Sequence, residues 1–200
     1  MNNLRRWCCL VGIVAASGLN ACSQDVTRGQ RVTCEKYGFS MAVPRGWSAG
    51  LIDMTTPMFI NFDPRTAPVP TPPIQLPKGG ATIGVLASDL EPGAKSSPEW
   101  LKTPRGWAAE VARREGLLEN PIITPIDFPR ESGVSNAVTT AFDDPTYSPG
   151  EQHQRCVNIF WEFGGRLFRA HLTYVKEDPR GAAHEKVFQD TIRTIRPLRK

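Results

Sequence analysis

CVNIFWEFGGRLFRAHLTYV, residues 156–175, predicts a β-hairpin. Apolar and polar residues alternate in both halves, which is typical of strands with one buried face. Gly164-Gly165 lies between the halves and supplies the positive φ angles that a two-residue hairpin turn requires. The predicted strands run from Cys156 to Phe163 and from Arg166 to Val175. Their buried faces would consist of Val157, Ile159, Trp161, Phe163, Phe168, Ala170, Leu172 and Tyr174.

Four further segments upstream of the hairpin are expected to form strands, because they are short, apolar and bounded by turn residues. They are residues 37–43, 58–62, 81–88 and 134–142. Two helices are expected as well. Ser97-Pro98 and Thr103-Pro104 are helix starts that predict a short turn and then a helix to about Leu117. Asp178-Pro179 starts a final helix whose apolar stripe is Ala183, Val187, Phe188, Ile192 and Ile195. Runs of strands with two helices predict an α+β fold with a mostly antiparallel sheet flanked by helices.

Residues 64–77 contain six prolines, which excludes a regular strand ladder and predicts an exposed, stiff loop. Pro70, Pro72 and Pro73 form its densest part. A second exposed segment is expected at 143–152, where Asp143 and Asp144 begin a turn. These two segments are the candidates for contact with a partner.

The first 22 residues resemble the signal peptide of bacterial lipoproteins. Arg5 and Arg6 precede an apolar run too short to cross a membrane, and Leu19-Asn20-Ala21-Cys22 resembles the lipobox. The resemblance implies removal of residues 1–21, acylation of Cys22 and a tether over 22–34. Ser23 then favours the outer membrane, facing the periplasm. The alternative is an ordinary secretory signal that happens to contain Cys22.

The cysteine count changes once the signal is removed. Cys8 and Cys9 leave with it and Cys22 carries lipid, so Cys34 and Cys156 remain. In an exported chain this pair predicts one disulfide, and two separate buried thiols are the alternative. Removal of the signal also lowers the net charge from +4 to +2. With no basic run or recognition motif, the sequence offers no case for nucleic-acid binding.

Catalytic and metal signatures are weak. Gly46-Trp47-Ser48-Ala49-Gly50 matches the nucleophile-elbow pattern, but residues 51–58 do not read as the helix that must follow. The three histidines, His153, His171 and His184, do not have the spacing of zinc ligands. His171 shares a strand face with Arg169 and Thr173 and is expected to be solvated. Calcium binding by Asp143, Asp144 and Glu151 is disfavoured, because two adjacent carboxylates do not supply six to eight oxygens. We therefore expect no catalytic residue, cofactor or metal.

The order of elements adds a resemblance over residues 35–197. A strand that ends in Val43-Pro44-Arg45-Gly46-Trp47, a late hairpin with a glycine turn and a closing helix resemble PsbP-like domains. The resemblance implies a single domain over 35–200 with an α/β/α sandwich. It also implies a non-catalytic binding or scaffolding role, with a protein partner in the envelope. The alternative function is an immunity or inhibitor lipoprotein that neutralises a toxin delivered to the periplasm.

Overall fold

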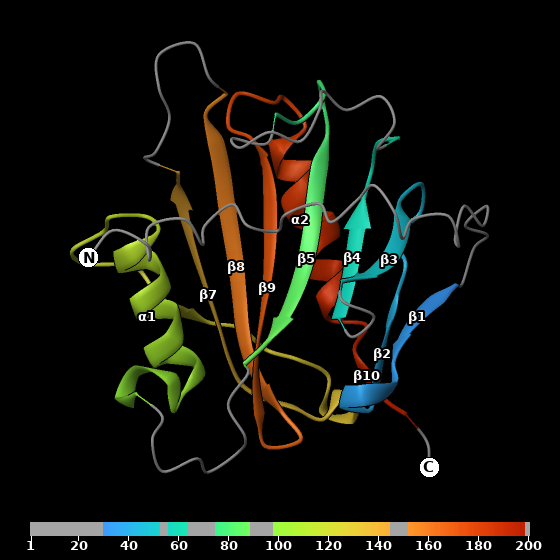
Figure 1. Cartoon of the computed structure of the whole chain (residues 1–200), viewed down its shortest axis with the longest axis vertical. Coiled ribbons are helices and arrows are strands. Elements are labelled where there is room, and N and C mark those ends of the chain that lie inside the picture. Colours follow the sequence, from blue (N-terminus) through green and yellow to red (C-terminus); the bar gives the residue numbers. More distant parts are fainter. Residues whose placement is uncertain (1–29, 53–55, 64–74, 89–97, 145–151, 199–200) are drawn as a thin grey trace.

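The computed structural model describes residues 30–52, 56–63, 75–88, 98–144 and 152–198 (Figure 1). Its main feature is a large antiparallel sheet with the strand order β3-β4-β5-β9-β8-β7-β6. The predicted hairpin, β8 and β9, lies in this sheet, and its turn glycines Gly164 and Gly165 have φ angles of 57° and 76°. The strands are β3 (Ser48–Ile52), β4 (Thr56–Ile60), β5 (Ala81–Ala87), β6 (Thr124–Pro125), β7 (Val134–Asp143), β8 (Gln154–Phe163) and β9 (Arg166–Val175).

Both predicted helices are present. Helix α1 (Pro104–Arg114) begins as expected: Thr103 is its N-cap, and the Thr103 hydroxyl accepts a 3.0 Å hydrogen bond from the Gly106 N–H. A 3-10 turn at Glu99–Leu101 precedes it. Helix α2 (Gly181–Ile192) begins after Asp178-Pro179. The α+β class, with a mostly antiparallel sheet flanked by helices, is therefore confirmed.

The two helices cover opposite faces of the large sheet. In Figure 1, α2 lies behind β9 and β5, whereas α1 lies at the side of β7. We call the two sides of the sheet the α2 face and the α1 face. Alternate residues of each strand point to opposite faces, so Ile159 and Leu172 belong to the α2 face and Asn158 and His171 to the α1 face.

The main core lies on the α2 face. A small second sheet, which was not predicted, also packs on this core. It is formed by β1 (Arg31–Cys34), β2 (Phe39–Ala42) and β10 (Arg196–Pro197) in the order β1-β2-β10. Trp161 stacks on Phe168, with ring centroids 5.6 Å apart and planes inclined by 15°. Fully buried members of this core include Phe39, Met41, Phe59, Ile83, Ile159, Trp161, Leu172, Phe188, Ile192 and Ile195.

A second, smaller core lies on the α1 face. Ala108, Val111 and Ala112 of α1 pack there against Val138, Phe142 and Phe160 of β7 and β8. This cluster ends at β8. From β9 onward, the described part of the α1 face is mostly half-buried instead of forming a packed core. The candidate site lies where the packed core ends.

Two predictions near the chain start need correction. The tether over 22–34 is too long, because Arg31–Cys34 form β1, pair with β2 and bury Cys34. No disulfide joins Cys34 to Cys156. Cys34 belongs to the core of the α2 face and Cys156 packs beside the core of the α1 face. Their side chains are therefore on opposite sides of the sheet, and burial raises the pKa of the Cys34 thiol to about 12.

Strand β3 was not predicted, because Ser48–Ile52 contains a glycine and does not alternate clearly. It pairs with β4 throughout and forms one edge of the large sheet. Within the described ranges, no helix has the length and apolar character needed to span a bilayer.

Candidate functional site

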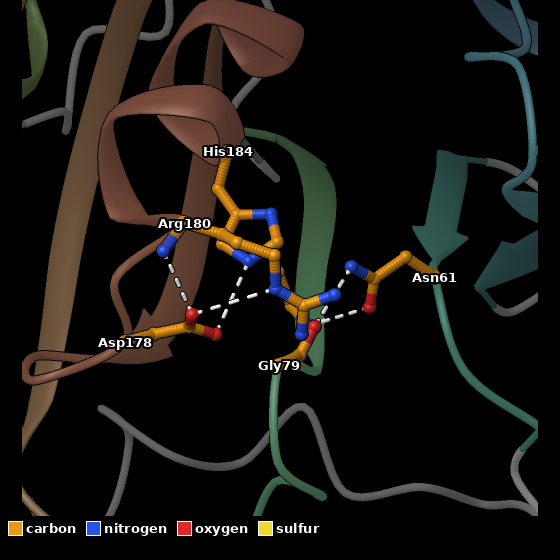
Figure 2. A network of polar contacts seen from close by, with 6 residues as sticks. Asn61, Gly79, Asp178, Arg180 and His184 are labelled. Carbon is orange, nitrogen blue, oxygen red and sulfur yellow. Dashed lines mark hydrogen bonds and ion pairs between the residues drawn. The ribbon is translucent and has the colours of Figure 1, made fainter.

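On the α2 face, a buried carboxylate orders the start of α2 (Figure 2). Asp178 Oδ1 accepts a 2.9 Å hydrogen bond from the Arg180 N–H, and Asp178 Oδ2 lies 3.4 Å from His184 Nε2. The Asp178 and His184 side chains are only 4% and 7% exposed. Burial alone would raise the pKa of Asp178, but the Arg180 N–H and the His184 ring lower it below its usual value.

The same network ties α2 to the turn before β5. The Arg180 guanidinium lies against Gly79, where a Cβ would sit 0.8 Å from Arg180 Nη2. Gly79 also has a φ of +72°, so both the backbone and the space require glycine. Asn61 holds the turn from the other side: its Nδ2 donates to Gly79 O at 3.1 Å, and its Oδ1 accepts from the Ala81 N–H at 2.7 Å. Figure 2 shows the contacts of Asp178 and those of Asn61, with the Arg180 side chain between the two groups beside Gly79.

A second network on the α2 face includes a predicted partner-binding residue. Asp143 accepts from Arg155 Nη1 at 2.9 Å and pairs with Lys176 at 2.8 Å. Burial would raise the pKa of Asp143, but these two cations lower it. Tyr174 donates from its hydroxyl to Glu185 at 2.7 Å, and burial raises the pKa of the Tyr174 phenol. Asp143 therefore serves ion pairs inside the chain.

Asp144 was predicted to be an exposed contact residue, but it is buried. Asp144 is 6% exposed, and its N–H donates to Gln154 O, because the pairing of β7 with β8 continues to this point. Pro70, Pro72, Pro73 and Glu151 lie outside the described residues, as does Cys22.

The α1 face holds the candidate functional site. Strand pairing places one residue from each of six strands in a single row across the sheet. Neighbours in such a row lie about 5 Å apart. The first three members, from β7, β8 and β9, are polar, and we call them the polar row. The other three, from β5, β4 and β3, include two glycines. In order, the row is Thr140, Asn158, His171, Gly84, Met58 and Gly50.

Each of the three polar members of this row carries a buried atom that has no hydrogen-bond partner among the described residues. These atoms are Thr140 Oγ1, Asn158 Nδ2 and His171 Nδ1. Each such atom costs about 1–3 kcal/mol of stability when it is left without a partner. Buried polar groups in proteins are nearly always paired, so three adjacent exceptions on one sheet face call for an explanation.

The charged residues beside the row neutralise each other. Arg169 donates to both carboxylate oxygens of Glu115 at 2.8 and 2.6 Å, and its Nε donates to Asn158 Oδ1 at 2.9 Å. Both side chains are mostly buried, and the Arg169 guanidinium lies 5.8 Å from the centre of the Phe160 ring. Glu115 follows α1 directly, so this bidentate pair fastens the end of that helix to the sheet.

His171 differs from the prediction. It shares a face with Arg169 and Thr173 as expected, but its Nδ1 is buried rather than solvated. The ring lies over Gly84, where a Cβ would sit 2.5 Å from His171 Cε1. Burial, with a smaller effect from Arg169, lowers the pKa of His171 to about 3. The imidazole is therefore neutral at physiological pH.

Beyond His171, the part of the α1 face that the structure describes continues without formally charged side chains. We call it the neutral shelf. Most of its side chains are half-buried, and they combine aliphatic groups with hydroxyls. Its members are Ser48, Gly50, Met58, Ile60, Thr82, Gly84, Leu86, His171 and Thr173.

The structure does not assemble a hydrolase from the serine motif. Ser48 begins strand β3 instead of standing at a strand-to-helix turn. His184 is on the α2 side of the sheet, whereas the register places Ser48 on the α1 face. His171 shares that face but is three strands away, at about 14 Å. His153 is exposed near the start of β8. Among the described residues, no three His, Cys, Asp or Glu side chains are close enough to hold a metal ion.

Sequence reasoning missed the Asp178–His184 pair and the polar row. The pair joins a turn to a helix, and no sequence spacing announces it. The row had a usable signal, because the hairpin alternation already placed Asn158, Arg169 and His171 on one face. The alternation of apolar and polar residues does not show whether that face is buried.

Comparisons with known proteins concern the fold. No family profile matches the sequence, and no curated protein matches it significantly. The chain is similar to a protein from Bacteroides thetaiotaomicron (13% identity, TM-score 0.46), covering 87% of this chain and 50% of that one, so it spans half the length of that protein. It is similar to the Ran-binding protein Mog1p from Saccharomyces cerevisiae (11% identity, TM-score 0.49), covering 86% and 97% of the two chains. Cyanobacterial PsbP from Synechocystis (12% identity, TM-score 0.45) is matched over 90% and 99%.

Proposed function

We propose that this protein is a lipid-anchored component of the bacterial envelope whose single domain binds a partner without catalysis. The proposed binding surface is the neutral shelf together with the polar row beside it. The observation that supports this most strongly is the row of three buried polar atoms without partners, which leads through His171 onto the shelf.

Buried polar atoms without partners lower the stability of the folded state. Replacing a polar group that has no partner by an apolar group of the same shape is neutral or stabilising. Thr140 and His171 are therefore poor choices for folding alone. Asn158 stands between them and binds Arg169 through its Oδ1, but its Nδ2 has no partner among the described residues. Thr140 and Asn158 are covered, whereas His171 is half-buried, so a bound molecule can reach the row through the His171 ring.

The anchoring part of the proposal depends on Cys22 and is tested separately. We expect the full-length wild-type protein to fractionate with outer membranes and to incorporate labelled palmitate. Cys22→Ala should incorporate none and should leave the membrane fraction. Cys34→Ala, which changes a buried thiol, is the matched control and should still be acylated. Equal labelling of wild type and Cys22→Ala would contradict lipidation.

The binding part is tested with a photo-crosslinking amino acid placed in the full-length protein in living cells. Thr82 is on the shelf, and Ala183 is an exposed position on α2 on the opposite side of the sheet. We expect a discrete crosslinked product from position 82 and none from position 183. Products of the same mass from both positions, or from neither, would overturn the assignment of the shelf as the binding surface.

A further inference from the structure

We infer that the neutral shelf takes an uncharged, hydroxyl-bearing ring molecule of the neutral saccharide class, held at its edge by a hydrogen bond to His171. This inference rests on the proposed function and specifies its ligand. Three properties of the shelf support this inference: its charge, its hydrogen-bonding groups and its shape.

The charge of the shelf excludes an ionic ligand. No shelf residue carries a formal charge, and the nearby charges of Arg169 and Glu115 are already paired in a bidentate contact. A charged ligand would lose hydration on this half-buried surface and would find no opposite charge to compensate the loss. A polar but uncharged ligand pays a much smaller desolvation cost.

The hydrogen-bonding groups fit hydroxyls. A neutral imidazole has one donor and one acceptor nitrogen, and a hydroxyl is likewise both donor and acceptor. Thr82 and Thr173 pair with each other across β5 and β9, which adds two hydroxyls in the row next to His171. The charged group that acts on His171 is Arg169 on its own strand, and Arg169 is paired with Glu115. Cys156 on the neighbouring strand β8 lies opposite Thr173.

The shape of the shelf fits a pyranose ring. Gly84 lets the imidazole lie flat against the sheet, and a Cβ built on Gly50 meets nothing within 4 Å. The strand backbone is therefore open at one end of the row. Met58, Ile60 and Leu86 flank these glycines with aliphatic side chains that can contact the C–H face of a pyranose, while the hydroxyls at its rim reach His171 and the threonines.

The test uses three sugars that share one ring and differ in charge: uncharged N-acetylglucosamine, cationic glucosamine and anionic glucuronate. Each is titrated to about 10 mM into the full-length protein and followed by the amide NMR signals of β5 and β9. We expect N-acetylglucosamine to shift these signals in a saturable way. The two charged sugars should bind at least about tenfold more weakly, because a bare charge on this surface is not compensated.

Two variants separate His171 from the rest of the shelf. His171→Phe keeps a flat ring over Gly84 but removes both nitrogens, and we expect about three- to tenfold weaker binding of N-acetylglucosamine. His153→Phe changes an exposed histidine away from the shelf and should leave binding unchanged. Thr82→Glu adds one negative charge to the shelf, so it should weaken glucuronate further and bring glucosamine into the measurable range.

The outcomes distinguish the two proposals. Absence of N-acetylglucosamine binding, or equal binding of all three sugars, overturns the ligand class; if position 82 still gives its crosslinked product, the proposed function stands. Unchanged affinity in His171→Phe overturns the role of His171. Absence of both sugar binding and crosslinking overturns the ligand class and the proposed function together.

Discussion

The two faces of the large sheet differ most clearly in how each holds its histidine. His184 on the α2 side contacts the Asp178 carboxylate and packs against the Trp47 and Tyr174 rings, with centroids 6.4 and 5.8 Å away. His171 on the α1 face has a buried Nδ1 without a hydrogen-bond partner. Most polar side chains described on the α2 face thus help to hold the fold, although Trp161 Nε1 there also lacks a partner among the described residues. The α1 face holds three such atoms side by side, next to the paired Arg169 and Glu115.

The largest expected effect comes from breaking the ion pair beside the row. Arg169→Met leaves the Glu115 carboxylate mostly buried without its cation and should lower the free energy of unfolding by about 3 kcal/mol. Urea unfolding measures the change. The double variant Arg169→Met, Glu115→Gln removes both charges and should recover most of the loss. Failure of the double variant to recover would mean that the two charges do not act as a pair.

On the α2 face, Asp178→Ala should lower the free energy of unfolding by about 2 kcal/mol, because it removes the acceptor of the Arg180 N–H and the contact to His184. Asp178→Asn keeps an acceptor oxygen and should lose less. Thermal unfolding checks both, since 1 kcal/mol corresponds to about 2–4 °C in a domain of this size. Equal losses would show that the charge of Asp178, rather than its hydrogen bonding, is what matters.

On the α1 face, Thr140→Val should make the protein more stable by about 1 kcal/mol. The substitution replaces a buried hydroxyl without a partner by a methyl group of the same shape. Thr191→Val is the matched control, because the Thr191 hydroxyl donates to Val187 O at 2.7 Å and its loss should be neutral or destabilising. A destabilised Thr140→Val would show that the hydroxyl is satisfied within the fold.

The two faces should also differ in the pH range over which they affect stability. The folded pKa of His171 is about 3, below its ordinary 6.5, so the unfolded chain takes up this proton first. Stability should therefore fall as pH drops from about 6.5 towards 3. The lowered pKa of Asp178 acts only below its ordinary 3.8. His171→Phe should flatten the upper part of the pH–stability curve and Asp178→Asn the lower part. A curve unchanged above pH 4 in His171→Phe would contradict the burial of the imidazole.

The sequence predicted local structure well where one or two residues determine the backbone. Gly164-Gly165 sets the hairpin turn and Thr103-Pro104 sets the start of α1, and both are found where expected. The period of two along β8 and β9 also assigned side chains to the correct faces. These features depend on neighbours in the chain, so sequence alone carries them.

Features that depend on packing between distant segments were not predictable. The alternation placed His171 on the outer side of the hairpin but could not show that its Nδ1 is buried. The cysteine count suggested a bond, but Cys34 and Cys156 belong to different cores. Asp144 looked like part of an exposed turn, although β7 and β8 continue to pair beside it.

The most direct measurement compares His171→Phe with His184→Phe by urea unfolding of otherwise identical protein. His184→Phe leaves the buried Asp178 carboxylate without its imidazole and should cost about 2 kcal/mol or more. His171→Phe removes a buried Nδ1 that has no partner among the described residues and should leave the free energy of unfolding unchanged or raise it. A loss in His171→Phe as large as that in His184→Phe would contradict the division of labour between the two faces.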